Sequence, residues 1–445
     1  MKSNTIQITS DEHQLVSVWW LRRDLRIIDN TALFNALKGQ YPVLLVFIFD
    51  TAILNHLSDK KDKRVNFIYQ ALLHLDAELK KQGSSLFILH DTPLAAFQKL
   101  CNAFDVKRVF TNHDYEPYAI ERDARVKEFL GSKNISFLSF KDQVIFERSE
   151  IMKPDKTPYT VFTPYSVIWK KKLDEEKIKI LSSEKLLSNL LKTKSFHFPT
   201  LEEIGFEKGE VTFEEPNISE EAIHKYHETR NLPSIEGTSQ MSVHLRFGTI
   251  SIRKLVNLAG KLNEKWLNEL IWREFFMMIL FHFPPVVDHN FKKKYDAIQW
   301  RNNEKEFELW CKGETGYPIV DAGMRQLNET GWMHNRVRMI TAGFLCKHLL
   351  IDWRWGEAYF AGKLLDYELS SNNGNWQWAA GTGCDAAPYF RIFNPETQIK
   401  KFDPKLIYIK KWIKDFRPDY INEVVKHEFA RKRALGVYKK ALEDS

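Results

Sequence analysis

The feature that most constrains the fold is a change in hydrophobic periodicity near residue 145 of the 445-residue chain. Before this point, short apolar runs rich in β-branched and aromatic residues alternate with stretches of helical periodicity. The runs cover residues 16–20, 42–49, 85–89, 108–111 and 136–140. Strands that alternate with helices in this way predict a parallel sheet covered by helices on both faces.

Two of the intervening helices carry recognisable end signals. One is expected at 31–38, behind the capping residues Asp29 and Asn30. The other is expected at 63–81, where the periodicity stops just before Gly83. These helices support an α/β assignment for the first part of the chain.

The remainder of the chain has a different character. Residues 146–220 are dominated by lysine, serine, glutamate and proline, which is typical of a surface connector between domains. From about residue 221 onward the periodicity is helical, for example at 266–280, 318–329 and 336–350. The predicted architecture is therefore α/β plus all-α: an N-terminal Rossmann-like parallel α/β domain (14–145), a long connector (146–220) and a C-terminal helical domain (221–445).

Composition and charge narrow the class of protein. The formal net charge of +7 is consistent with a polyanionic partner such as nucleic acid. The first residues are polar and no apolar run approaches the length of a membrane span, so we expect a cytoplasmic protein with no membrane contact. The four cysteines are widely spaced and form no C-x-x-C pair, which argues against a disulfide framework and a zinc site.

Common catalytic motifs do not occur. The segment after the first strand reads LRRDLRIIDN rather than G-x-G-x-x-G, and no P-loop, G-x-S-x-G or H-E-x-x-H motif occurs elsewhere. If the chain is an enzyme, its chemistry is expected to come from a bound organic cofactor. The 13 tryptophans, ten of them after residue 260, can serve as core fillers, stacking surfaces or oxidisable groups.

One segment of the helical region combines three kinds of side chain on one face. Glu269, Trp272 and Arg273 are three or four residues apart, so a helix brings them together. An indole that stacks, a carboxylate that accepts hydrogen bonds and a guanidinium that holds phosphate would suit a nucleic-acid base. A buried tryptophan beside an ordinary ion pair would give the same pattern.

Two further segments are dense in polar groups. In the first, GWMHNRVRM, His334 has the character of a structural histidine rather than a catalyst. The second holds Asp366, Glu368 and the run NNGNWQW at 372–378, where small and amide residues lie beside indoles. This composition suits close approach to a flat ligand, although a tight interhelical turn would look similar.

Blocks throughout the chain then carry a resemblance to a known family. They include VSVWWLRRDLRIIDNTAL, GTSQMSVHLRFGTIS, WLNELIWREFF, TGYPIVDAGMRQLNETGWMHNRVRMITAGFL and NNGNWQWAAGTGCDAAPYFRIFNP. The chain resembles the photolyase/cryptochrome family, and within it the class I cyclobutane pyrimidine dimer (CPD) DNA photolyases. Residues 146–220 match least.

The resemblance implies a folded FAD in the helical domain. It implies that Asn372 faces flavin N5 and that a loop of donor groups holds the diphosphate. The residues implied to line the flavin site are Tyr226, Thr238, Ser239, Gln240, Met241, Ser242, Trp266, Arg338, Asp366, Glu368 and Asn372. The sequence departs from the usual family pattern in two places: position 368, here Glu, is often Asp, and the run 240–243, here Gln-Met-Ser-Val, is often Arg-Leu-Ser-Pro.

The implied reaction is photochemical. Fully reduced FADH⁻ absorbs light and passes an electron to a flipped-out dimer, which splits and returns the electron. Glu269 is implied to hydrogen-bond the dimer, while Trp376, Trp353 and Trp300 form an electron relay to the flavin. The residues implied to contact DNA are Arg230, Glu269, Trp272, Arg273, Asn335, Arg336, Met339, Trp378 and Gln398.

Other readings stay open. A cryptochrome-type blue-light photoreceptor without repair activity has the same fold, and repair of (6-4) photoproducts or a cofactor-free basic DNA-binding module are further alternatives. Lysines at 292–294 and 410–411 suit phosphate attraction or a solvated face. The resemblance implies a second, antenna chromophore, methenyltetrahydrofolate or a deazaflavin, with Asn112 and Glu116 near where a folate would bind; a flavin or no chromophore are the alternatives. The family resemblance implies a monomer.

Overall fold

The computed structural model describes residues 14–417, 420 and 422–443, which form two compact units. The first unit comprises the chain up to Ile145 together with Ile178–Asn217 and His244–Leu255. The second comprises Phe146–Lys177, Ile218–Val243 and the chain from Val256 onward. The segment expected as a connector, 146–220, is thus divided between the two units, and the predicted domain limits stay a prediction.

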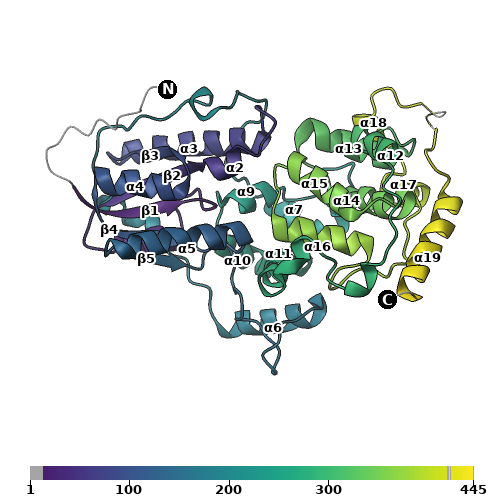
Figure 1. Ribbon diagram of the computed structural model, residues 1–445, viewed down its shortest axis with the longest axis horizontal. Helices are drawn as coiled ribbons and strands as arrows, with labels where there is room; N and C mark the ends of the chain where they lie inside the picture. The colour runs from purple at the N-terminus through teal and green to yellow at the C-terminus, as the bar shows by residue number, and fades with distance from the viewer. Residues whose placement is uncertain (1–13, 418–419, 421, 444–445) are drawn as a thin grey trace. The chain divides into compact units, whose positions relative to one another are not determined.

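The first unit is built on a five-stranded parallel sheet with strand order β3-β2-β1-β4-β5 (Figure 1). The chain passes from β1 to β2 and β3 on one side of β1, and then crosses to β4 and β5 on the other side. Right-handed crossovers therefore place α1 and α3 on one face of the sheet and α4 and α5 on the other. The elements are β1 (Leu15–Leu21), α1 (Thr31–Leu37), β2 (Val43–Asp50), α2 (Thr51–Leu54), α3 (Lys63–Lys81), β3 (Leu86–Asp91), α4 (Pro93–Ala103), β4 (Asp105–Asn112), α5 (Pro117–Ser132) and β5 (Ser136–Phe140).

Capping residues and apolar runs in the sequence explain where these helices and strands form. Asn30 caps α1 by accepting a hydrogen bond from the Leu33 N–H, as the sequence predicted. Helix α3 has the predicted bounds, and Asp62 caps it. All eight residues of β2 are buried, as expected of a central strand with helices on both faces. The predicted α/β fold of this part is confirmed.

Two later segments complete the first unit. Residues 178–217 hold η1 (Ser183–Lys185), η2 (Leu187–Asn189) and η3 (Glu202–Ile204) and contact the start of β2, where the Leu191 N–H donates to the Val43 carbonyl at 2.9 Å. The segment 244–255 then returns through α9 (Ser242–Phe247) and the start of α10 (Ile252–Leu262).

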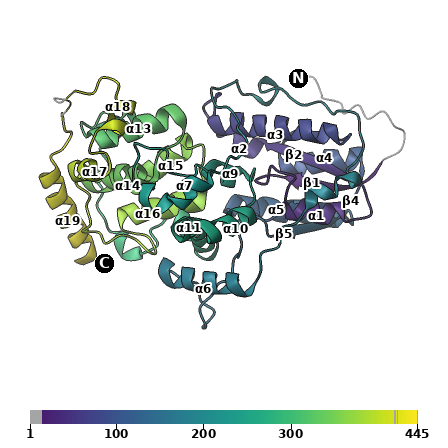
Figure 2. The ribbon, with the colours of Figure 1, turned by 180° about the vertical axis from the view of Figure 1, so that it is seen from behind.

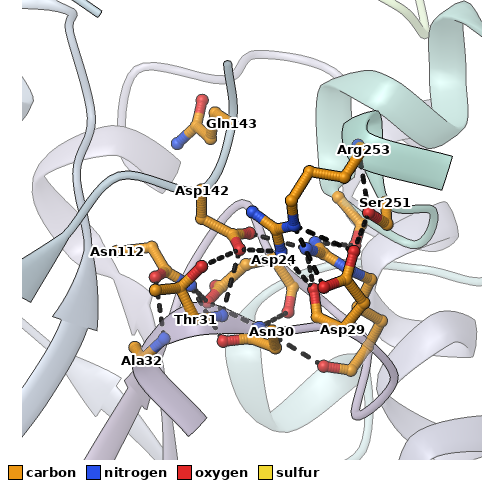
Figure 3. Close-up of polar contacts among 12 residues, drawn as sticks. Asp24, Asp29, Asn30, Thr31, Ala32, Asn112, Asp142, Gln143, Ser251 and Arg253 are labelled. Carbon is orange, nitrogen blue, oxygen red and sulfur yellow. Dashed lines mark hydrogen bonds and ion pairs between the residues drawn. The ribbon is translucent and has the colours of Figure 1, made fainter. Parts of the chain in front are cut away.

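A buried polar cluster holds the segment 244–255 in the first unit (Figure 3). Arg253 donates to both oxygens of Asp29, at 3.0 and 2.9 Å, and to Asp142 at 2.8 Å. Arg26 donates to the other oxygen of Asp142 at 2.7 Å. Burial alone would raise the pKa of Asp142, but the guanidinium groups of Arg26 and Arg253 hold it below its ordinary value. The cluster therefore pairs two buried carboxylates, Asp29 and Asp142, with two guanidinium groups.

The second unit is helical, as predicted (Figure 2 shows it from behind). Its main core joins α13, α14, α15, α16 and α18 around residues such as Val320, Leu345 and Trp376. The elements are α6 (Phe162–Glu175), α7 (Glu220–His224), α8 (Tyr226–Thr229), α11 (Glu264–His282), η4 (Pro284–Val287), η5 (Lys293–Tyr295), α12 (Glu304–Lys312), α13 (Pro318–Thr330), α14 (Asn335–Gly343), η6 (Phe344–Leu349), α15 (Trp353–Lys363), α16 (Leu369–Ala380), α17 (Pro395–Phe402), α18 (Ile407–Trp412) and α19 (His427–Glu443).

The helix expected at 336–350 differs from the prediction. It ends at Gly343 and continues as the π-helical segment η6, which closes at Leu350 with φ +50°. The wider turn turns Lys347 into the core, where its Nζ donates to the Ala380 carbonyl at 2.6 Å. Burial lowers the pKa of Lys347 to about 7. A lysine inside an apolar run gives no periodic signal of such a turn.

Within the described residues, every helix is too short or too polar to cross a membrane. The same residues contain no group of three or more His, Cys, Asp or Glu side chains placed to hold a metal ion. The four cysteines are free thiols.

Candidate cofactor and substrate site

The second unit contains a cavity with an empty volume of about 600 Å³, part of it open to solvent. This size lies within the range of cofactor sites in proteins. Its walls come from α14, the end of α15, the turn before α16, and α16 itself. The predicted site residues that line it are Asn335, Arg338, Met339, Asp366, Glu368, Asn372, Trp376 and Trp378.

An ion pair between Arg338 and Asp366 forms one polar side of the cavity. The Arg338 Nη2 donates to the Asp366 Oδ2 at 2.9 Å, and its Nε donates to the Met333 carbonyl at 2.7 Å. Because two bonds from different atoms hold the guanidinium, its plane is fixed. The structure thus brings together two residues that the sequence analysis assigned to the flavin site.

A second carboxylate, Glu368, lies at the start of α16. It accepts hydrogen bonds from Arg273 at 3.1 Å and from the Ser371 hydroxyl at 3.1 Å. The Arg273 side chain is 11% exposed, so it lies mostly inside the unit. Arg273 was expected to contact DNA, whereas the structure places it against a residue expected to bind the flavin.

The amide of Asn372 is held in one orientation by a residue that the sequence analysis did not single out. Its Nδ2 donates to the Glu357 Oε1 at 2.7 Å and to the Glu357 carbonyl at 3.1 Å. Since both amide hydrogens are used, the Oδ1 is the atom left to accept a hydrogen bond from a ligand. Burial raises the pKa of Glu357. Glu357 gave no sequence signal because its partner lies on another helix, fifteen residues away.

The expected diphosphate loop lies beside the first turn of α11. The Trp266 Nε1 donates to the Ser239 hydroxyl at 3.2 Å, and that hydroxyl also accepts from the Met241 N–H at 3.4 Å. Gln240 adopts a left-handed conformation with φ +52°. Thr238 and Ser242 flank these residues, while Tyr226 lies on α8 with the Arg230 guanidinium 5.3 Å from its ring centre. None of these described residues lines the cavity.

Two of the residues expected to contact a lesion form an ion pair between the end of α8 and helix α11. Arg230 pairs with Glu269 at 2.6 Å. Burial raises the pKa of Glu269, against the opposing effect of Arg230. Trp272 lies one turn further along α11.

A second cationic side chain, Arg336, lies nearby. It donates to the Asn231 Oδ1 at 2.6 Å, and its guanidinium stacks 4.5 Å from the Phe402 ring centre. Burial together with the charges of Arg230 and Arg391 lowers the pKa of Arg336. The three arginines are therefore close enough to repel one another, an arrangement that favours an anionic partner. Gln398 is partly exposed on α17.

The three tryptophans expected as a relay lie in one core. Trp376 lines the cavity and packs directly against Gly356 of α15, where an added Cβ would lie 2.1 Å from the indole. Trp353 begins α15 and donates to the Asn290 Oδ1 at 2.8 Å. Trp300 packs at the edge of the same core, with its ring centre 6.0 Å from that of Tyr438. The series thus runs from the cavity wall to a partly exposed side chain.

The first unit offers little free polar capacity at the position expected for a folate. The Asn112 Nδ2 donates to Asp24 at 2.6 Å and Asn30 at 2.9 Å, and its Oδ1 accepts from the Ala32 N–H at 3.0 Å (Figure 3). Glu116 pairs with Arg23 at 3.1 Å and Arg246 at 2.9 Å. The bonding groups of Asn112 are therefore already used within the unit.

Of the lysines considered for phosphate attraction, Lys293, Lys294, Lys410 and Lys411 are exposed. Lys292 is partly buried, and its N–H donates to the Thr382 carbonyl at 3.0 Å.

Two family models match this chain. Residues 17–182 match the model described as DNA photolyase, and residues 266–439 match the model described as FAD binding domain of DNA photolyase. A deoxyribodipyrimidine photo-lyase of Halobacterium salinarum is 35% identical and covers 96% of this chain and 100% of its own length. The Escherichia coli protein of the same name is also 35% identical, over 95% of this chain and 98% of its own.

Solved structures agree with these matches. A bacterial class III photolyase from Agrobacterium tumefaciens has a TM-score of 0.81 and 30% identity, over 98% of this chain and 100% of its own. An archaeal photolyase from Sulfolobus tokodaii, described with two FAD molecules and a novel light-harvesting cofactor, has a TM-score of 0.77 and 32% identity, over 96% and 100% of the two chains. A Synechocystis cryptochrome with a TM-score of 0.79 is 23% identical over 96% of this chain and all of its own, and it shares the fold.

Proposed function

The chain belongs to the DNA photolyase family, and from this premise we propose that it splits cyclobutane pyrimidine dimers in DNA in a light-dependent reaction. The observation that carries the proposal is the make-up of one cavity. Its lining contains polar groups that suit a flavin. It also contains Trp376, which is packed into the core, and Trp378, which can stack on a base.

FAD fits the chemistry of the residues present. The fixed Asn372 amide presents an acceptor to a ring N–H, and the Arg338–Asp366 pair offers a charged edge to a polar ring system. Hydroxyl and N–H groups at 238–242 suit a diphosphate, and the Trp266–Ser239 bond holds that loop to α11. When bound, FAD supplies light absorption and electron donation, which no side chain can supply.

The protein's own residues provide recognition and placement of the dimer. A dimer within a duplex must leave the stack to reach the cavity, and its weakened stacking makes this easier than for normal bases. Trp378 and Trp272 are proposed to stack on its bases, with Met339 beside them. Glu269 is proposed to accept a hydrogen bond from a base edge.

The arginines are proposed to bind the DNA backbone on either side of the lesion. Burial and the charge of Arg230 lower the pKa of Arg336, and phosphate binding would relieve the repulsion between the two guanidinium groups. Asn335 and Gln398 are proposed to add hydrogen bonds, while Arg273 serves mainly to hold Glu368.

Electron supply to the cofactor is proposed to follow the tryptophan series. Trp376, Trp353 and Trp300 can each lose an electron transiently without breaking a bond, and they lie in one packed core. We also propose that the enzyme acts as a monomer in the cytoplasm, where its DNA substrate lies. A second chromophore in the first unit would have to bind without the bonding groups of Asn112.

The test is repair of an oligonucleotide with a single thymine dimer by the purified flavin-loaded protein, in blue light and in the dark. Recovery of thymine absorbance in the light only is the expected result. Bound flavin without recovery would indicate a photoreceptor of the cryptochrome type or another lesion. Absence of flavin binding would contradict the proposal at its root.

A further inference from the structure

Phe162, the first residue of α6, covers one face of the Trp272 indole. Their ring centres are 3.7 Å apart and their planes differ by 4°, so the rings are parallel with little offset. The face of Trp272 toward Phe162 is therefore closed to any other ring.

Phe162 is itself fixed in the second unit. Its side chain is 9% exposed and packs edge-on against Phe275, which is fully buried. Its N–H donates to the Asp385 Oδ2 at 3.0 Å. Because Val161 has no side chain that can cap α6, the Asp385 carboxylate from a distant segment takes that role at the helix N-terminus.

Helix α6 is also anchored to α11, which carries Trp272. The buried Glu274 of α11 accepts hydrogen bonds from the Trp169 Nε1 at 2.5 Å and from the Phe146 N–H at 2.9 Å. Without Glu274 the buried Trp169 Nε1 would lose its acceptor, so this bond holds α6 against α11. Phe162 thus approaches Trp272 from a rigid support.

We propose that Phe162 is a positioning residue for recognition of the dimer. It fixes the plane of the Trp272 indole and covers one of its faces, so that a pyrimidine ring can stack only on the opposite face. This inference rests on the proposed function, because it assumes that Trp272 stacks on the lesion. The orientation of the Trp272 indole is then set by Phe162, about 110 positions earlier in the chain, and not by α11 alone.

The Asp385 contact connects Phe162 to the segment near Trp378, the other tryptophan proposed to stack on the dimer. Asp385 lies in the segment after α16, which carries Trp378, and Gly381 turns the chain there with φ +86°. Through its ring and its N–H, Phe162 therefore touches Trp272 directly and connects to the segment that follows Trp378.

The test compares Phe162→Leu with the conservative variant Phe162→Tyr in the flavin-loaded protein. We expect Leu to weaken binding of a thymine-dimer oligonucleotide in the dark by about tenfold, since a mobile indole loses part of its stacking. Binding of the undamaged oligonucleotide and the flavin absorption spectrum should not change, and Tyr should restore dimer binding. Circular dichroism and flavin content verify that each variant is folded.

A double-variant cycle with Trp272→Leu tests whether Phe162 acts through the indole. If it does, Phe162→Leu has no further effect once Trp272 is replaced, whereas independent effects would add. Additive effects, or unchanged dimer binding by folded Phe162→Leu, would overturn the inference. Tighter binding by Phe162→Leu would show that Phe162 occupies the place of a base. If the unaltered protein itself does not distinguish dimer from undamaged DNA, the proposed function fails instead.

Discussion

The polar clusters of the two units differ in how completely they are satisfied. In the first unit, Asp29 and Asp142 are paired with Arg26 and Arg253, all buried, and the two carboxylates also accept from the Ser251 and Thr31 hydroxyls and from backbone N–H groups of the same unit (Figure 3). In the second unit, polar groups of similar kind line a cavity, and Asn372 keeps an acceptor for a ligand. Polar groups whose hydrogen-bonding capacity is fully used stabilise the fold, while a polar group that keeps a free acceptor can bind a ligand.

The largest effect is expected from breaking the closed cluster. Arg253→Met leaves two buried carboxylates without one of their partners, which should lower the free energy of unfolding by about 3–5 kcal/mol. The measurement is the urea midpoint followed by circular dichroism. Arg125→Met is the control, because Arg125 pairs with Glu121 in an exposed i,i+4 contact and should change stability by less than about 0.5 kcal/mol. Equal effects of the two variants would contradict the comparison.

The next effect concerns the cationic side of the proposed lesion site. Glu269→Gln removes the charge that pairs with Arg230 and weakens the hydrogen bond offered to a base edge. Repair per photon should fall by about tenfold, the usual scale for a hydrogen bond to a charged group. Glu264→Gln is a matched control in the first turn of the same helix, where the side chain is exposed and pairs with Lys170. Loss of repair in the control, or full repair by Glu269→Gln, would exclude this role.

The sequence could predict the features that depend on residues close together in the chain, but not those that depend on distant residues. Helix α3 and the strands were predictable because periodicity and local caps such as Asp62 act over a few residues. The cavity residues Asp366, Glu368 and Asn372 were assigned through the family resemblance. Pairs between distant residues left no such signal: Asp29 meets Arg253, and Phe162 meets Trp272, through tertiary packing alone. The π-helical segment η6 was missed for a related reason, since burial of Lys347 depends on Ala380 of another helix.

A smaller effect is expected at the residue that orients Asn372. Glu357→Leu removes one of two acceptors for the Asn372 amide, a change of about 1 kcal/mol. We expect bound flavin to be retained but to reoxidise in air about fivefold faster after reduction, because the amide can then turn. Stopped-flow absorption of the reduced protein measures the rate. Glu357→Gln, which keeps an acceptor, is the control and should resemble the unaltered protein, and an unchanged rate in Glu357→Leu would contradict the orienting role.

The smallest effects, each involving a single proton, should have opposite signs in the two units. The pKa of Asp142 is lowered, because Arg26 and Arg253 outweigh the effect of burial, so its pairing stabilises the fold above the ordinary aspartate pKa of about 4 and is lost as the pH falls through the lowered value. The pKa of Glu357 is raised by burial, so its folded state gains protons and the stability that it contributes declines as the pH rises above the ordinary glutamate pKa of about 4.3. Relative to the unaltered protein, Asp142→Asn should therefore become less stable as the pH rises toward the ordinary aspartate pKa of about 4, whereas Glu357→Gln should become more stable as the pH rises above about 4.3. Urea unfolding at a series of pH values measures both slopes. Slopes of the same sign would mean that the closed cluster and the open cavity do not differ in the way their charges are held.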